Sequence, residues 1–177
     1  MPIKGFDPAI KAIIVISHGL AEHSGRYDGL ANKLKALGYA VYALDHQGHG
    51  QSEGTRGYVK AFMDFPADVI QLTKMAKEKN PLVKKVFLLG HSMGSLISIH
   101  TVNAAPDLFD GVVLSAPPLA ADLPPGTKEF GPMISKYLPK LPGPPIEGLH
   151  TLSRDPHVVD RYCKCIIDHQ LLLLKTM

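Results

Sequence analysis

The chain has 177 residues, of which 45% are hydrophobic and 20% charged, and its formal net charge is +3. This length suits one domain with a buried core, and the composition excludes a mainly disordered chain. The small, scattered charge argues against nucleic-acid binding, and two cysteines, Cys163 and Cys165, are too few for a disulfide framework or a metal cage. Because no secretory signal or membrane-length apolar segment is visible, we expect a cytoplasmic protein.

Strand patterns recur along the first two thirds of the chain. Residues 12–17 (AIIVIS) are continuously apolar and β-branched, which is typical of a strand buried on both faces of a parallel sheet. Further strands are predicted at residues 39–45, 86–89 and 111–117. Helix patterns separate these strands, so we expect an α/β fold in which helices cover a mostly parallel sheet.

Three helices are predicted from apolar residues at helical spacing, the first ending before Gly38 and the second beginning at Asp64. Their inner faces are expected to be Leu30, Leu34 and Leu37 in the first helix, Phe65, Val69, Leu72 and Ala76 in the second, and Met93, Leu96, Ile97 and His100 in the third. From residue 117 to residue 145 the chain is rich in Pro and Gly, which indicates an excursion from the sheet.

The most informative motif is Gly-His-Ser-Met-Gly at residues 90–94. It joins a predicted strand to a predicted helix, the setting in which a sharp turn lifts a nucleophilic serine above the sheet. Ser92 is therefore the candidate nucleophile. We expect the backbone N–H groups of Leu20 and Met93 to form an oxyanion hole, each donor lowering the barrier by roughly 3 to 4 kcal/mol. The structural alternative is a tight turn with a capping serine.

Three motifs occur together in this order: HGLAEHSGRY, DHQGHGQSEGTRG and GHSMGS. With them, residues 12–160 resemble the monoacylglycerol lipase group of α/β-hydrolases, of the serine aminopeptidase S33 type. The resemblance implies part of an α/β-hydrolase fold, no cofactor, and hydrolysis of fatty acyl esters of glycerol or of lysolipids through an acyl-enzyme on Ser92. It also implies a core at residues 1–117, followed at residues 118–177 by a cap or lid segment and an atypical tail.

The same resemblance implies that Glu22, Arg26 and His91 bind substrate near its glycerol end. Alternatively, Glu22 and Arg26 pin their loop and His91 caps the turn. The chain departs from the family pattern at Ala21 and Ser95, where glycine is usual, so a tighter loop and helix start are expected.

Several histidine, tyrosine and methionine side chains are expected to have structural roles and not to bind a ligand. Three histidines, His18, His46 and His49, follow strands and are expected to shape the site, because no partner has the spacing of a metal-binding motif. Four further side chains fit the core or a helix face better than a ligand site: Tyr27, Tyr39, Tyr42 and Met75.

The resemblance places residues 128–140 in a cap above the active site. One helical face there is apolar and is formed by Phe130, Met133, Ile134, Tyr137 and Leu138, with Lys128, Lys136 and Lys140 near it. This face is expected to admit an acyl chain and to allow peripheral membrane contact, or else to pack on the core.

No acid and base of a triad can be assigned. Possible substitutes are His150, Asp155, His157, Asp160, Asp168 and His169, none of which is placed by its spacing to serve Ser92. We therefore expect a C-terminally truncated and impaired hydrolase with two open apolar sheet edges. Two alternatives remain: a non-catalytic module that binds lipid or a protein partner, and a hydrolase of another small ester or amide.

Overall fold

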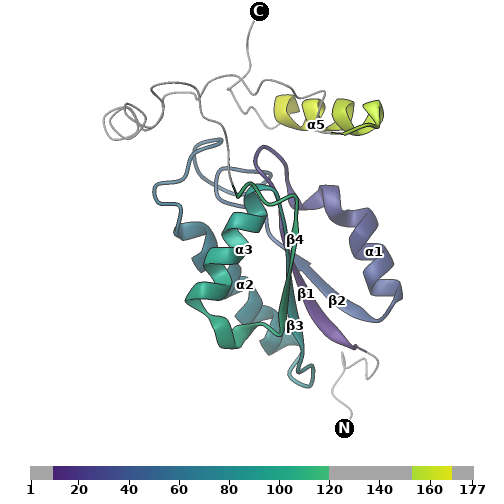
Figure 1. The fold of residues 1–177 in the computed structure, drawn as a ribbon, viewed down its shortest axis with the longest axis vertical. Coiled ribbons are helices and arrows are strands. Elements are labelled where there is room, and N and C mark those ends of the chain that lie inside the picture. Colours follow the sequence, from purple (N-terminus) through teal and green to yellow (C-terminus); the bar gives the residue numbers. More distant parts are fainter. Residues whose placement is uncertain (1–9, 120–152, 169–177) are drawn as a thin grey trace, which may run out of the picture.

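A computed structural model describes residues 10–119 and 153–168, the last few of these as backbone only. Its centre is a four-stranded parallel sheet (Figure 1). The strands are β1 (Ala12–Ser17), β2 (Tyr39–Ala43), β3 (Val86–His91) and β4 (Gly111–Ser115), and their order across the sheet is β2-β1-β3-β4. The predicted α/β architecture is confirmed, and every residue of β1 is buried between its two neighbours.

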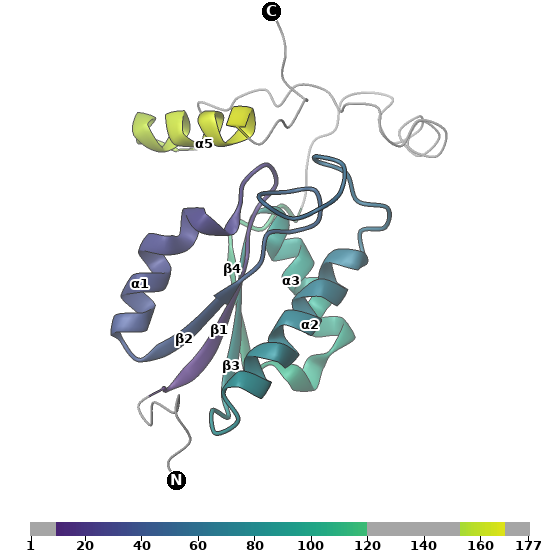
Figure 2. The same cartoon turned by 180° about the vertical axis from the view of Figure 1, so that it is seen from behind.

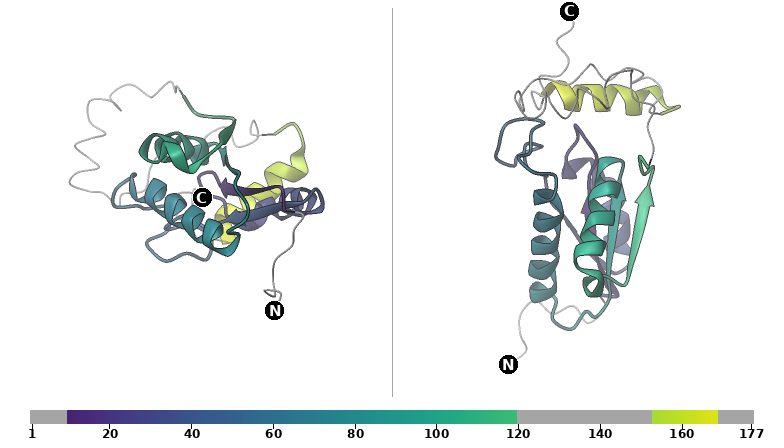
Figure 3. Two further views of the ribbon diagram at one scale, coloured as in Figure 1. Left: turned by 90° about the horizontal axis from the view of Figure 1, so that it is seen from below. Right: turned by 60° about the vertical axis from the view of Figure 1, so that its left-hand side comes forward.

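Helices cover both faces of the sheet. The helix α1 (Asp28–Ala36) lies on one face, whereas α2 (Asp64–Lys79) and α3 (Met93–Ala104) lie on the other (Figures 1 and 2). Short 3-10 helices precede α1 and β4, at Ser24–Tyr27 and Pro106–Leu108. The last element, α5 (Pro156–Asp168), crosses above the carboxyl ends of the strands (Figure 3). Among the described residues, no helix is long and apolar enough to cross a membrane.

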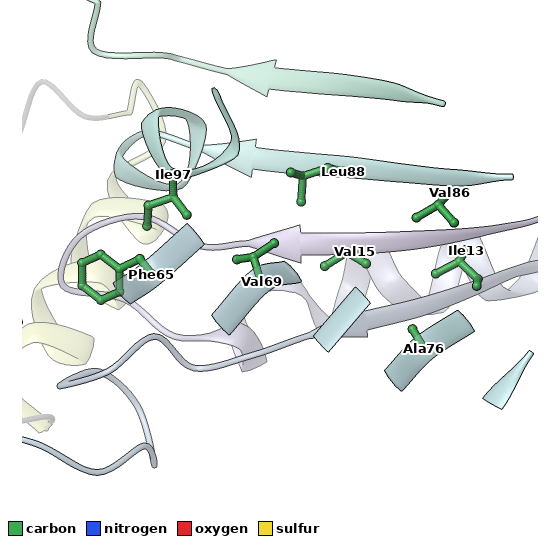
Figure 4. Close-up of a cluster of buried hydrophobic side chains, with 8 residues drawn as sticks. All are labelled: Ile13, Val15, Phe65, Val69, Ala76, Val86, Leu88 and Ile97. Carbon is green, nitrogen blue, oxygen red and sulfur yellow. The ribbon is translucent and has the colours of Figure 1, made fainter. Parts of the chain in front are cut away.

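The hydrophobic core lies between the sheet and the pair α2 and α3 (Figure 4). It is formed by Ile13, Val15, Phe65, Val69, Ala76, Val86, Leu88 and Ile97. In β1 and β3, alternate side chains point to the same face of the sheet, and paired residues of the two strands lie side by side on it. The core residues of both strands therefore pack together against α2 and α3. This packing fixes the end of β3, from which the chain turns into α3.

The strand ends differ from those expected. β3 runs on to His91, which pairs with Ser115, whereas β2 stops at Ala43 and β4 at Ser115. Beyond β2, the Asp45 carboxylate accepts hydrogen bonds from the backbone N–H groups of Ser24 (2.8 Å) and Gln51 (2.8 Å). The chain leaves the sheet after β2, because the Asp45 carboxylate binds N–H groups of two loops and the strand pairing does not continue.

Two predicted helix faces are partly wrong. His100 is exposed and its ring stacks edge-on against Phe62, while α3 buries Gly94, Ser95, Ile97, Ser98 and Thr101. The small residues let α3 approach the sheet, and the hydroxyls of Ser98 and Thr101 donate to carbonyls one turn earlier. Leu30 in α1 and Leu37 directly after it are exposed, because α1 covers the edge strand β2 and buries no residue. Met75, expected in the core or on a helix face, is 45% exposed on α2.

Within the described sheet, β2 and β4 are the edge strands, as expected. Val112 and Val113 on β4 are exposed, Val113 by 55%. An uncharged edge of this kind offers unpaired N–H and C=O groups to another strand.

Candidate active site

Ser92 occupies a strained turn between β3 and α3. Its backbone has φ 51° and ψ −120°, a left-handed value of φ that a residue with a side chain rarely adopts. The Ser92 N–H donates to the carbonyl of Ser115 (2.9 Å), and the Ser92 carbonyl accepts from the N–H of Ser95 (2.8 Å). The turn is therefore tied on one side to β4 and on the other to the first turn of α3.

The two glycines of the motif allow close contact of backbone segments. A Cβ atom on Gly94 would overlap the carbonyl of Ser17, and one on Gly90 would overlap the carbonyl of Gly94. Ser95, where the family pattern has glycine, is fully buried, and its hydroxyl lies 2.9 Å from the Gly90 carbonyl and 3.0 Å from that of Ser115. Its hydroxyl thus adds a link between the turn and β4.

The loop after β1 lies directly beside Ser92. A Cβ atom built on Gly19 would lie 3.2 Å from the Ser92 Cβ, so the two backbones are in contact range. Leu20 follows at the pocket surface, and Met93 begins α3, where the helix dipole favours negative charge. Ala21 is buried with φ 60°, a conformation that favours the glycine of the family pattern. The oxyanion role of the Leu20 and Met93 amides stays a prediction.

The buried Glu22 carboxylate binds several groups of the loop that follows β1. Its Oε1 accepts hydrogen bonds from the Gly19 N–H (2.6 Å) and from the Tyr27 hydroxyl (2.6 Å), and its Oε2 lies 2.9 Å from the Arg26 Nε. Burial, followed by the nearby Glu22 carboxylate, raises the pKa of Tyr27, which keeps its hydroxyl a donor. The geometry fits the loop-pinning alternative for Glu22, while Arg26 also borders the pocket.

Three buried histidines support the loop from below. The His18 Nδ1 donates to the Gly19 carbonyl (2.7 Å), and the His18 Nε2 accepts from the His46 N–H (2.9 Å), so His18 is neutral. His46 Nε2 shares a hydrogen bond with the Ser17 hydroxyl (2.8 Å). Burial lowers the pKa of His18 to about 4 and that of His46 to about 2, and also lowers the pKa of His49. Their expected structural role agrees with this placement.

Helix α5 forms the opposite wall and was not predicted. The Asp155 carboxylate accepts from the His157 N–H (2.9 Å) and caps the helix, with Pro156 as its first residue. The sequence signal was the Asp-Pro pair at residues 155–156. Val158, Val159 and Tyr162 face the strand ends, and the Tyr162 hydroxyl donates to the Leu20 carbonyl (2.9 Å).

A pocket of about 190 Å³ lies between these two walls. On the sheet side it is bordered by Gly19, Leu20, Glu22, Arg26, His91, Ser92 and Ala116, and on the helix side by Val158, Val159 and Tyr162. Ser92 is thus brought together with all three predicted substrate-binding residues. His91 Nδ1 is 3.1 Å from the Ser115 hydroxyl, and His91 borders the pocket. Ala116 and the three α5 residues were missed.

The acid and base stay unassigned. Asp155 and His157 serve the start of α5, and Asp160 lies further along it. The Asp168 side chain, His150, His169 and the apolar cap face at residues 130–138 lie outside the described residues. Among residues 10–119 and 153–164, no group of three His, Cys, Asp or Glu is placed to hold a metal ion.

A model of the family described as serine aminopeptidase S33 matches residues 8–165. The chain belongs to the serine aminopeptidase S33 family. Human monoglyceride lipase is 44% identical to it over 156 residues, which are 86% of this chain and 50% of that protein. Monoacylglycerol lipase of Mycolicibacterium smegmatis is 38% identical over 155 residues, 86% of this chain and 54% of that protein. The predicted family resemblance is thereby confirmed.

The crystal structure of Paleococcus ferrophilus monoacylglycerol lipase matches the S33 chain with a TM-score of 0.76 and 29% identity. The match covers 93% of this chain and 69% of that one. The described sheet and helices are accordingly part of an α/β-hydrolase fold, as predicted. The chain spans about half the length of the curated relatives it matches.

Proposed function

We propose that this S33 chain carries the nucleophile half of a serine ester hydrolase that cleaves fatty acyl esters of glycerol or of lysolipids. The observation that carries the proposal is the strained backbone of Ser92, φ 51°, in the turn between β3 and α3, where Ser92 borders the pocket. A left-handed conformation at a serine in a strand-to-helix turn costs free energy and is a recurrent feature of reactive sites. The names of the matched relatives, which are lipases of monoacylglycerols, support the substrate class.

In the proposed reaction the Ser92 Oγ attacks the ester carbonyl carbon and forms a new C–O bond. The carbonyl oxygen becomes an oxyanion beside the N–H groups of Leu20 and Met93. The bond to the glycerol oxygen then breaks, and glycerol leaves as an alcohol with the proton taken from Ser92 by a base. Water repeats the sequence on the acyl-enzyme, releasing the fatty acid and restoring the serine. The acid and base belong to no described residue that we can assign.

The rim of the pocket fits a polar head group next to an apolar chain. Arg26 and His91 offer hydrogen-bond donors beside Ser92, while Val158 and Val159 offer apolar surface opposite them. We propose that Arg26 and His91, with Glu22 orienting Arg26, contact the glycerol end. An acyl chain would then extend along α5.

We expect the 177-residue chain alone to turn over esters slowly. Loss of triad members typically lowers turnover by about 10⁴ to 10⁶, while binding and the oxyanion hole leave about 10³ to 10⁴ over water. Because a base is needed to activate Ser92 for acylation as well as for deacylation, slow covalent labelling over a long incubation, rather than steady-state turnover, is the measurement suited to this chain.

The test is covalent labelling by a fluorophosphonate, compared among wild type, Ser92→Ala and Ser98→Ala. Ser98 is a matched control because it is a buried serine of α3 that bonds to the Gly94 carbonyl. Wild type and Ser98→Ala should be labelled at residue 92, and Ser92→Ala should not. Equal labelling of Ser92→Ala and wild type would overturn the proposal. Absence of labelling with retained lipid binding would favour the non-catalytic module.

We also propose peripheral membrane contact through the apolar cap face at residues 130–138, which lies outside the described residues. A basic apolar helix face binds lipid surfaces by burying its apolar side chains. Ile134→Glu should weaken sedimentation with liposomes, whereas Lys74→Glu on α2 should not. Unchanged sedimentation of Ile134→Glu would contradict the contact.

A further inference from the structure

Tyr162 links α5 to the loop that contains the proposed oxyanion donor. Its hydroxyl donates a 2.9 Å hydrogen bond to the carbonyl of Leu20, across a sequence separation of 142 residues. The acceptor belongs to Leu20, whose own N–H is one of the two proposed oxyanion donors. A side chain on the opposite wall of the pocket thus contacts the backbone on which the chemistry would depend.

The ring of Tyr162 makes a second contact with the same loop. The Arg26 guanidinium lies 5.1 Å from the centre of this ring, within the range of a cation–π interaction. The Arg26 Nε pairs with Glu22, and Glu22 accepts the hydrogen bond from the Gly19 N–H. The contacts from Tyr162 therefore reach the loop both directly and through two charged side chains.

These contacts bracket the peptide group that carries the Leu20 N–H. The carbonyl of this peptide group, that of Gly19, accepts a hydrogen bond from the His18 Nδ1. The Gly19 N–H before it is bound by Glu22, and the Leu20 carbonyl after it is bound by Tyr162. The next residue, Ala21, has φ 60° in a conformation that favours glycine, so the loop gains little support from its own backbone preference. External hydrogen bonds have to keep this loop in place.

We propose that Tyr162 is a positioning residue: its hydroxyl holds the Leu20 loop so that the Leu20 N–H stays turned toward the oxyanion position above Ser92. The seating of α5 and the order of the oxyanion loop are then coupled. Movement of α5 to admit a substrate loosens the loop, and its return restores the donor. The catalytic part of this inference rests on the proposed function, whereas the structural link does not.

The direct test is residue-resolved amide hydrogen exchange in wild type, Tyr162→Phe and Tyr42→Phe. Tyr162→Phe keeps the ring beside Arg26 and removes only the hydroxyl. Tyr42→Phe is a matched control, because the Tyr42 hydroxyl accepts a 2.7 Å bond from Asn80 far from the pocket. Exchange of the Gly19 N–H should accelerate about fivefold in Tyr162→Phe, the change expected for one typical hydrogen bond. The Ala105 N–H, bonded to the Thr101 carbonyl at the end of α3 away from Ser92, serves as an internal reference and should not change.

The kinetics of phosphonylation distinguish a role of Tyr162 in positioning the loop from a role in shaping the pocket. The limiting rate constant for phosphonylation of Ser92 should fall about fivefold in Tyr162→Phe with unchanged apparent affinity for the fluorophosphonate. Equal Gly19 exchange in Tyr162→Phe and wild type would overturn the inference, as would a change confined to affinity. If wild type is not phosphonylated at all, the proposed function fails, and the exchange result still decides whether Tyr162 holds the loop.

Discussion

The two walls of the pocket are built in different ways. The sheet wall consists of backbone turns in close contact, with no room for a Cβ atom at Gly94 and with His18 and His46 fully buried beneath. The helix wall presents the half-buried side chains Val158 and Tyr162, in contact with the loop below. The reactive geometry therefore depends on the folded core, whereas we expect the helix wall to tolerate changes without unfolding of that core.

Acid should destabilise the sheet wall more than any of the substitutions below. Burial lowers the pKa of His18 to about 4 and of His46 to about 2, from 6.5 in the unfolded chain. Below pH 6.5 the unfolded chain therefore binds more protons, so stability is complete above that pH and falls as the pH drops toward 4. Two histidines give a slope of about 2.7 kcal/mol per pH unit.

Urea unfolding followed by circular dichroism between about pH 7.5 and about pH 5 measures this slope. His100→Gln is the control, because His100 is an exposed histidine on α3, outside the buried histidine cluster. A free energy of unfolding that stays constant over this range would show that the buried histidines do not limit stability.

The next effect concerns close packing at the start of α3. Gly94→Ala would push a methyl group into the Ser17 carbonyl and should destabilise the protein by about 3 kcal/mol. Gly29→Ala, in α1 with open space around it, should instead stabilise by up to about 1 kcal/mol. Thermal melts of both variants make the comparison, and similar melting temperatures would contradict the packing described for the sheet wall.

A smaller effect is expected at Ser95, whose hydroxyl reaches the carbonyls of Gly90 and Ser115. Ser95→Ala should lower the free energy of unfolding by about 1 kcal/mol, because a buried link between helix and sheet is lost. Ser98→Ala removes a bond within α3 itself and should cost less. Denaturant titration of the two variants measures both free energies of unfolding. A larger decrease in Ser98→Ala than in Ser95→Ala would contradict the prediction.

The smallest effect is expected on the helix wall. Val158 is half-buried on α5, so Val158→Ser should change the free energy of unfolding by less than about 0.5 kcal/mol. The same variant should still bind a fluorophosphonate less tightly, because the pocket loses apolar surface. A loss of stability as large as that of Gly94→Ala would mean that α5 is part of the core.

Local patterns were sufficient to predict the sheet and the turn. The apolar run of β1 and the glycines around Ser92 have few structural solutions, and both were predicted from sequence. The inner face of α3 was misjudged at His100, because Gly, Ser and Thr form the buried side and hydrophobicity does not mark them. The exposed leucines of α1 depend on which strand it covers, which no local pattern reveals.

Long-range contacts explain the rest of what the sequence did not show. Tyr162 meets Leu20 across 142 residues, and α5 begins at an Asp-Pro signal too short to stand out beforehand. Glu22 was placed by resemblance near the substrate, but its two short hydrogen bonds, to Gly19 and Tyr27, are visible only in three dimensions. The sequence alone could name residues of the sheet wall and could not place the wall opposite.

A crystal structure of the chain after reaction with a phosphonate would show whether Ser92 presents its hydroxyl beside two backbone donors. We expect a P–O bond to the Ser92 Oγ, with the phosphoryl oxygen about 2.7–3.1 Å from the nitrogens of Leu20 and Met93. Phosphorus on another side chain, or a phosphoryl oxygen directed away from both nitrogens, would contradict the account.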